Sequence, residues 1–305
     1  MHPAISVIFF TVMSGAGFGF MAMIGLGWPM PQGPLTAFLI CFLAGGLAVI
    51  GLLSSTFHLG HPERAWRAFS QWRSSWLSRE GVLAVVTLIL FGIYTLVWMT
   101  TGERTGALGF VITILSLVTI YATSMIYAQL KTVPSWHSNL TPVCYVAFGI
   151  ASGLVLAATF GAKHGMMGNM AALFAGLSLM IAWGAKALWW KHADGVGFSQ
   201  TGSDTGTATG LGHLGKVKLF EKPHSGENYL TKEMMHQVGR KHSKKLRRIS
   251  VILGLLIPFL MAALSYQFGG HGLFMFIGFI SMIAGLFAER WLFFAEAKHA
   301  VSLYY

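Results

Sequence analysis

Two ionisable residues, His58 and Glu80, stand at the ends of neighbouring apolar segments, in a chain that otherwise avoids charge. The sequence around them, STFHLGHPERAWRAFSQWRSSWLSREG (residues 55–81), also concentrates basic and aromatic side chains. An ionisable group at the edge of a bilayer is costly, and it indicates a functional site. Imidazole exchanges protons near neutral pH, and desolvation favours the protonated form of a carboxyl group. The pair is therefore suited to trade protons with a membrane-dissolved quinone, whose two carbonyl oxygens each need such a partner.

Two other interpretations of the same stretch remain open. Pro62 ends any preceding helix and can open the next one. A helix over residues 63–79 would place four aromatic residues along one side: Trp66, Phe69, Trp72 and Trp76. This pattern predicts an amphipathic helix in the headgroup plane, which would serve as an anchor alone. Alternatively, Glu80 forms an ordinary boundary ion pair with Arg73 or Arg79.

The elements that must position these residues are predicted by hydropathy. The chain of 305 residues is 54% hydrophobic and 10% charged, whereas a soluble domain carries about 25% charged residues. Continuous apolarity excludes a lipid-facing sheet, because its backbone would remain unsatisfied in hydrocarbon. Eight apolar runs approach the length of about 20 residues that crosses a bilayer as a helix. They fall near residues 4–27, 36–57, 81–100, 106–129, 141–161, 167–189, 249–268 and 272–294. We predict an all-α integral membrane protein, a single domain over residues 1–305 with eight transmembrane helices.

The distribution of Lys and Arg predicts how this bundle is oriented. An even number of spans puts both termini on one side, together with the loops after the second, fourth and sixth spans. Those loops contain most of the basic residues, and the opposite loops contain only Arg104 and Lys163. By the positive-inside rule, both termini and the interfacial helix face the cytoplasm. Residues 190–248 then form one long cytoplasmic loop, which either rests on anionic lipid or docks a partner.

Glycines inside the spans predict close packing between helices. Gly15 and Gly19 in the first span, and Gly149 and Gly153 in the fifth, have the small-xxx-small spacing that lets backbones approach. Ser14, beside the first pair, either lines a cavity or bonds its own helix backbone.

Two further classes of membrane protein compete with a quinone-binding subunit. A b-type cytochrome needs axial ligands well inside the spans, but all twelve histidines lie at predicted span ends or in loops. We therefore expect no haem. A stand-alone secondary transporter places charged groups or broken helices near the midplane. Pro258 can break the seventh span, but no acidic or basic residue lies deep in that span.

Several motifs resemble a known family. HPAISVIFFTVMSGAGFGF at the start, HLGHP after the second run and SREG at the third resemble the membrane anchor subunit of dimethyl sulfoxide reductase. The motifs TGLGHLGKVKLFEKPHSGENYL and ERWLFFAEAKHAVSLYY are more similar to anchors of quinone-linked cytoplasmic sulfite dehydrogenases. The resemblance implies a subunit of a bacterial inner membrane that is not itself catalytic toward the substrate. Its partners would be an iron–sulfur electron-transfer subunit and a molybdopterin catalytic subunit.

The resemblance also implies a site for ubiquinone or menaquinone at the face that meets the iron–sulfur subunit. The family's histidine and glutamate correspond to His58 in HLGHP and Glu80 in SREG. His61 stands where the reductase anchors usually have asparagine, and it is either a second proton-exchanging group or a headgroup contact. The candidate supporting residues are Ser14, Arg73, Trp76, Ser78 and Arg79. In the reductase the catalytic subunits lie outside the membrane. The charge bias here predicts cytoplasmic partners, with electrons from sulfite oxidation reaching quinone.

Overall fold

A computed structural model of the chain describes residues 4–30, 33–59, 61–161, 166–198, 204–221, 226, 242–269 and 272–303. These residues form helices, turns and loops without a strand, and eight of their helices are long and apolar enough to cross a membrane. The eight are α1 (Ile5–Gly25), α2 (Pro34–Ser54), α3 (Trp76–Thr101), α4 (Gly106–Ala128), α5 (Leu140–Gly161), α6 (Met166–Gly195), a continuous helix over Ser243–Gln267, and α12 (Gly272–Ala295). The predicted all-α class and the eight spans are confirmed.

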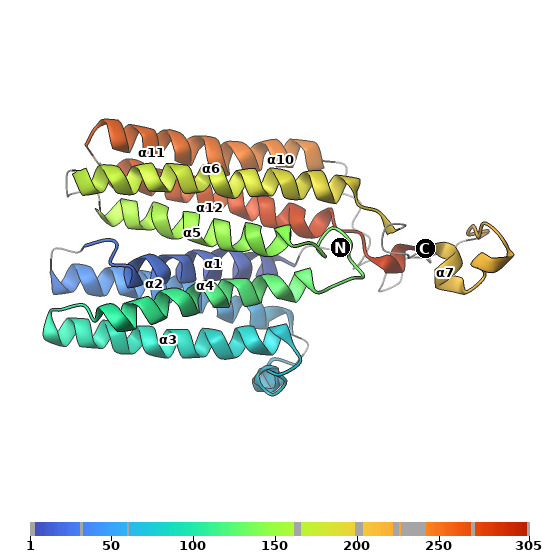
Figure 1. The fold of residues 1–305 in the computed structure, drawn as a ribbon, viewed down its shortest axis with the longest axis horizontal. Coiled ribbons are helices and arrows are strands. Elements are labelled where there is room, and N and C mark those ends of the chain that lie inside the picture. Colours follow the sequence, from blue (N-terminus) through green and yellow to red (C-terminus); the bar gives the residue numbers. More distant parts are fainter. Residues whose placement is uncertain are drawn as a thin grey trace.

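The spans lie side by side and form two groups of four (Figure 1). Helices α1 to α4 pack against one another in the first group, and α5, α6, α12 and the Ser243–Gln267 helix form the second. Helix α1 contacts α5 and α12 as well as α2 and α4, and it is the most deeply buried of the eight. The described chain begins and ends at the same end of the bundle (Figure 1). We call this the basic end, because the connections and helix ends there carry Arg64, Arg67, Arg73, Arg79 and Lys131.

Close backbone contacts join the two groups through α1. A Cβ atom on Gly19 would lie 1.9 Å from the carbonyl oxygen of Gly149, and one on Gly153 would lie 2.2 Å from the carbonyl oxygen of Gly19. The predicted packing role of these three glycines is confirmed. Gly15 differs, because a Cβ there would meet nothing within 4 Å. The two glycines that share this spacing in α1 therefore differ: Gly19 is in close backbone contact, whereas Gly15 has open space beside it.

The seventh span remains continuous past Pro258 because it changes its helical pitch. Helix α10 (Ser243–Val251) leads into a π-helical turn (Ile252–Leu256) and then α11 (Ile257–Gln267). Proline lacks the N–H that would bond the carbonyl four residues earlier, and that carbonyl belongs to Gly254. The Trp183 indole N–H donates to it at 2.9 Å, and the Ser281 hydroxyl donates to Leu253 O at 2.8 Å. Neighbouring helices thus satisfy the freed backbone groups, as the membrane interior requires.

Three spans extend further at the basic end than hydropathy predicts. Helix α3 begins at Trp76, α6 continues to Gly195, and α10 begins at Ser243. Charged residues that the sequence places in flanking loops, Glu80 among them, consequently belong to helices. Of the predicted 190–248 loop, the structure describes these helix ends, a short helix α7 (Thr205–Thr209) and a 3-10 turn at Gly212–Leu214. Helix α7 lies beyond the ends of the spans (Figure 1).

Candidate functional site

The segment that carries His58 continues directly from α2. A 3-10 helix, η1 (Ser55–His58), adds one turn and contacts α1. The hydroxyl groups of residues 54–56 each donate to a carbonyl three residues earlier, which favours this tighter turn. The Ser54 hydroxyl also lies 3.1 Å from Ser6 O, which links α2 to the start of α1. The backbone of His58 therefore lies at the basic end, while its side chain and Gly60 are outside the described part of the chain.

The prediction of a helix over residues 63–79 is wrong in its extent, because the observed helix is shorter. A 3-10 helix, η2, covers Pro62–Phe69, and turns then lead to the extended residue Ser75. The Ser70 hydroxyl donates to Arg67 O at 2.7 Å, which gives the backbone an alternative to continued helix. In Figure 1, η2 is the blue coil seen end-on below α3, so its axis crosses those of the long helices.

The four aromatic residues of this stretch consequently do not share one helical face. Trp66 and Phe69 belong to η2, Trp72 lies in the turn, and Trp76 opens α3. Trp66 and Trp72 are more than half exposed. The Phe69 ring, by contrast, folds back onto α3. A methyl group on Gly81 would lie 3.1 Å from its Cε1 atom.

Arg79 holds the turn before α3 in place. Its Nε donates to Trp72 O at 3.0 Å, and its Nη2 donates to Arg73 O at 2.6 Å. Its guanidinium lies 4.5 Å from the ring centre of Trp76, whose indole meets the Tyr121 ring edge-on. Arg79 therefore orders the polypeptide beside Glu80.

Glu80 is buried, with 4% of its surface exposed. The Thr123 hydroxyl on α4 lies 3.3 Å from its Oε1, and that hydroxyl also lies 3.0 Å from Thr119 O. The ion pairs found among the described residues do not include Glu80, so the alternative pair with Arg73 or Arg79 is not formed there. A nearly unexposed carboxyl group beside a hydroxyl is suited to holding a proton, because burial favours its neutral form.

The other predicted site residues occupy different surroundings. Ser78 is buried on the first turn of α3. His61 is exposed and lies 2.9 Å from the Glu63 carboxylate through Nδ1. Arg73 is also exposed, and its guanidinium lies 5.5 Å from the Trp72 ring centre. The structure therefore keeps His61 and Arg73 at the surface, away from the buried carboxyl group.

A small cavity of about 20 Å³ lies between α1, α4, α5 and α12. Its polar lining comes from Thr11, Ser14, Thr123, Tyr145 and Arg290. Ser14 is 3% exposed, and its hydroxyl donates to Phe10 O at 2.6 Å, so it bonds its own helix and lines the cavity. Because Thr123 faces both the cavity and Glu80, the two sites are contiguous.

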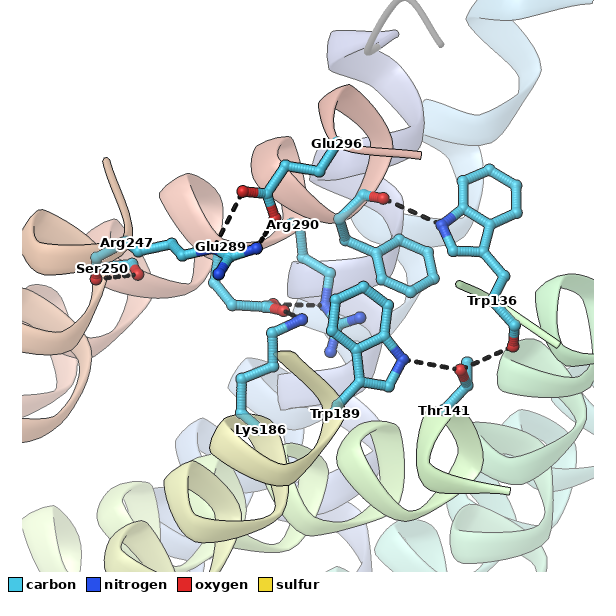
Figure 2. Close-up of polar contacts among 10 residues, drawn as sticks. Trp136, Thr141, Lys186, Trp189, Arg247, Ser250, Glu289, Arg290 and Glu296 are labelled. Carbon is cyan, nitrogen blue, oxygen red and sulfur yellow. Dashed lines mark hydrogen bonds and ion pairs between the residues drawn. The ribbon is translucent and has the colours of Figure 1, made fainter. Parts of the chain in front are cut away.

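Three charged residues that were not predicted as site residues form a buried cluster (Figure 2). Lys186 Nζ on α6 lies 2.5 Å from Glu289 Oε1, and Arg290 Nε lies 3.0 Å from Glu289 Oε2. All three are at most 4% exposed. The ammonium group also lies 3.6 Å from the Trp189 ring centre, and the guanidinium lies 3.9 Å from that of Tyr145. The sequence contains a signal for this cluster, because all three residues lie within predicted spans, where ionisable residues are rare.

A second charged junction lies nearer the basic end. Arg247 on α10 donates to both carboxylate oxygens of Asp194 at 2.7 Å, and to Glu296 at 2.9 and 3.0 Å. It therefore ties α6 and α10 to the residue that follows α12. Figure 2 shows its contact with Glu296. All three residues line a pocket of about 420 Å³. Burial raises the pKa of the Glu296 carboxyl group, while its contact with Arg247 opposes that change.

Within the described ranges, no three His, Cys, Asp or Glu side chains come together as a metal site would require.

The sequence is similar to one known family along nearly its whole length. The model of the DMSO reductase anchor subunit (DmsC) family matches residues 1–295. The chain belongs to this family. It is 35% identical to the C subunit of the sulfite dehydrogenase of Allochromatium vinosum, with 100% of this chain and 99% of the relative aligned. It is 27% identical to the anaerobic dimethyl sulfoxide reductase chain YnfH of Escherichia coli, over 50% of this chain and 55% of that one. No solved structure matches it.

Family membership and the eight apolar helices together define a multi-pass membrane anchor subunit of a DMSO reductase-type complex. Complexes of this type also contain a catalytic subunit and an iron–sulfur subunit. The anchor is related along its whole length to a sulfite dehydrogenase subunit, whereas its similarity to the reductase chain covers half of it.

Proposed function

We propose that this anchor subunit binds a quinone between the His58 segment and Glu80 and passes electrons to it from an iron–sulfur partner. The observation that carries the proposal is the burial of Glu80 one turn inside the basic end. A carboxyl group at that depth that forms no ion pair among the described residues is expensive to retain, and proton exchange with a bound carrier explains its presence.

In the proposed reaction, the quinone accepts two electrons and two protons and becomes a quinol. Glu80 donates one proton to one carbonyl oxygen and is left as a carboxylate. His58 donates the other proton to the second oxygen. Both residues then take up protons again before the next turnover.

The neighbouring residues would shape this pocket. Arg79 fixes the turn over residues 71–75, and Trp76 and Phe69 offer aromatic surface beside the first turn of α3. Buried Ser78 lies on the same turn, and Ser14 lies across the adjacent cavity. His61 and Arg73, which are exposed, are proposed to contact lipid headgroups or the docked partner.

The whole-length similarity to a sulfite dehydrogenase subunit supports sulfite as the source of the electrons. The basic end supports a cytoplasmic position for both termini in a bacterial inner membrane, because positive charge is retained on that side. The iron–sulfur subunit would then dock at the same end. We propose residues 190–248 as part of its docking surface, with the molybdopterin subunit bound beyond it.

The proposal is tested with Glu80→Gln and His58→Ala in the intact complex. Each variant should lower quinone-dependent sulfite oxidation by about 100-fold or more, the usual contribution of an acid–base group. Oxidation with an artificial electron acceptor that bypasses this chain should persist. Glu63→Gln is the matched control, because Glu63 is an exposed carboxylate in the same stretch. Wild-type quinone turnover in both test variants would refute the proposed site.

A further inference from the structure

Polar groups continue inward from Glu80 across the bundle. The Thr123 hydroxyl contacts the Glu80 carboxyl group on one side and lines the small cavity on the other. Arg290 lines the same cavity from α12, and its Nε pairs with Glu289. Glu289 in turn pairs with Lys186 on α6. The route therefore runs from the first group of helices into the second.

The cavity has the size and chemistry for water. Its volume of about 20 Å³ exceeds the ~10–15 Å³ that one water molecule needs, and it is too small for a quinone ring. A buried water also requires two to four polar partners. Four residues that carry a hydroxyl or guanidinium group line the space: Ser14, Thr123, Tyr145 and Arg290.

The buried cluster also leads toward the surface at the basic end. Glu296 directly follows α12, and its backbone N–H still donates to Leu292 O at 2.9 Å. Because the helical pattern continues to this residue, Glu289 and Glu296, seven residues apart, lie on one side of the helix and about 10 Å apart along it. Figure 2 shows the Arg247–Glu296 pair beside the Lys186–Glu289 pair. Trp189 joins the two regions, because its ring contacts Lys186 and also lines the pocket that contains Glu296.

We propose that this series of groups is a hydrated proton route from the Glu296 pocket to Glu80. The inference rests on the proposed quinone reaction, in which each C=O group of the quinone becomes C–O–H. The iron–sulfur partner supplies the two electrons. Once Glu80 has given its proton to the quinone, a water in the cavity passes a proton to the Thr123 hydroxyl as that hydroxyl passes its own proton to the carboxylate. A proton that enters from the Glu296 pocket is transferred to the same water, so that neutral water and protonated Glu80 are restored.

The charges of the buried cluster fit this role. Lys186 and Arg290 carry two positive charges against the single negative charge of Glu289. One positive charge is therefore in excess in a low-dielectric interior, where charges need nearby compensation. The neighbouring junction supplies that compensation, because Asp194 and Glu296 carry two negative charges against the single positive charge of Arg247. These opposite net charges link the buried cluster to the Glu296 pocket, where the proposed proton route begins.

The hydroxyl step is tested with Thr123→Val, which keeps the side-chain shape, and Thr123→Ser, which keeps the hydroxyl. Quinone turnover by the intact complex is measured in H₂O and D₂O and divided by the artificial-acceptor rate. Thr123→Val should slow turnover by about 100-fold or more, the range for a lost proton-transfer group, and should raise the solvent isotope effect. Thr123→Ser should restore both. Thr159→Val is the control, because among the described residues that hydroxyl bonds its own helix, at Val155 O.

The cavity is tested separately with Gly15→Val. Gly15 lines the cavity, and an added Cβ meets nothing within 4 Å, so a new side chain at this position starts in open space. Gly45→Val on α2 is the matched control, since Gly45 is equally open and does not line the cavity. Filling the cavity should slow quinone turnover and raise the isotope effect, while the control should match wild type.

Quinone binding, measured by equilibrium titration of a short-chain quinone, separates this inference from the proposed site. The route is supported if Thr123→Val and Gly15→Val bind quinone normally but turn it over slowly. It is overturned if either variant has wild-type turnover and isotope effect, if Thr123→Ser is as slow as Thr123→Val, or if the slow variants have lost quinone binding. If Glu80→Gln itself turns over normally, the proposed site has failed instead.

Discussion

Two glycines four residues apart on α1 should respond in opposite ways to the same substitution. A Cβ at Gly19 would lie 1.9 Å from Gly149 O, whereas a Cβ at Gly15 has open space around it. An ordinary carbon–oxygen contact is about 3.3 Å, so Gly19→Ala requires α1 and α5 to separate by more than an ångström. Because α1 also packs against α2, α4 and α12, that movement would disturb contacts on several sides.

The expected difference between the two variants is about 3–4 kcal/mol. Overpacking a close-packed interior costs about 1–3 kcal/mol, and the size of this overlap places Gly19→Ala near the upper value. Gly15→Ala meets no neighbour and should gain about 0.5–1 kcal/mol from the lower flexibility of alanine in a helix. Both substitutions add one methyl group to the same helix, so they control for each other.

The measurement is the thermal unfolding of the detergent-purified complex. The quantity recorded is the fraction of the complex that remains monodisperse after heating to each temperature. Gly19→Ala should lower the midpoint by roughly 6 °C or more, and Gly15→Ala should leave it unchanged or slightly higher. Equal midpoints for the two variants would refute the reasoning, because they would mean that backbone proximity at Gly19 does not hold the two helix groups together.

Two further substitutions test the charged groups. Glu289→Gln leaves the buried Lys186 ammonium without its anionic partner, and we expect a loss of about 3–5 kcal/mol, measured as the thermal midpoint of the purified complex. The exposed Lys191→Gln is its control, and an equal midpoint in both variants would contradict the buried pair. Arg79→Lys cannot donate to Trp72 O and Arg73 O in the same geometry. It should lose about 1.5–3 kcal/mol of local stability, seen as faster hydrogen exchange over residues 70–76, whereas unchanged exchange would argue against a structural role for the guanidinium.

The fold could be predicted from the sequence because hydrocarbon leaves the backbone few choices. Apolar runs of sufficient length must become helices when no water is present to satisfy their peptide groups. The ends of the spans were predicted less well, since polar side chains begin before the helix stops. Glu80, Asp194 and Arg247 all lie within helices because a neighbouring helix supplies each with a hydroxyl or charged partner.

Residues 63–79 show how a spacing that fits a helix can still predict a helix that is too long. The spacing of Trp66, Phe69, Trp72 and Trp76 fits an α-helix, yet the chain leaves helical geometry after Phe69. Periodicity reports which residues would share a face if the segment were helical. It does not include the competing hydrogen bonds, such as that from Ser70 to Arg67 O and those from Arg79 to two carbonyls of the turn.

The buried ion cluster could have been suspected but not assembled from the sequence. Lys186, Glu289 and Arg290 each interrupt an apolar run, which marks them as unusual. Their partnership depends on α6 and α12 both packing against α5 and α11, and hydropathy gives no information about which spans are neighbours.

The position of α1 explains why both groups of helices contribute to one polar interior. Glu80 and Thr123 belong to the first group, whereas Tyr145, Arg290, Glu289 and Lys186 belong to the second. Helix α1 contacts α5 and α12 of the second group, and its glycines let α5 come close enough at Gly149 and Gly153 for Thr123, Tyr145 and Arg290 to share a single small cavity. A larger residue at Gly19 would separate the groups, whereas the missing side chain at Gly15 leaves the space in which they meet. Close packing at one glycine and open space at the next are therefore both needed to connect the buried carboxyl group to the charged cluster.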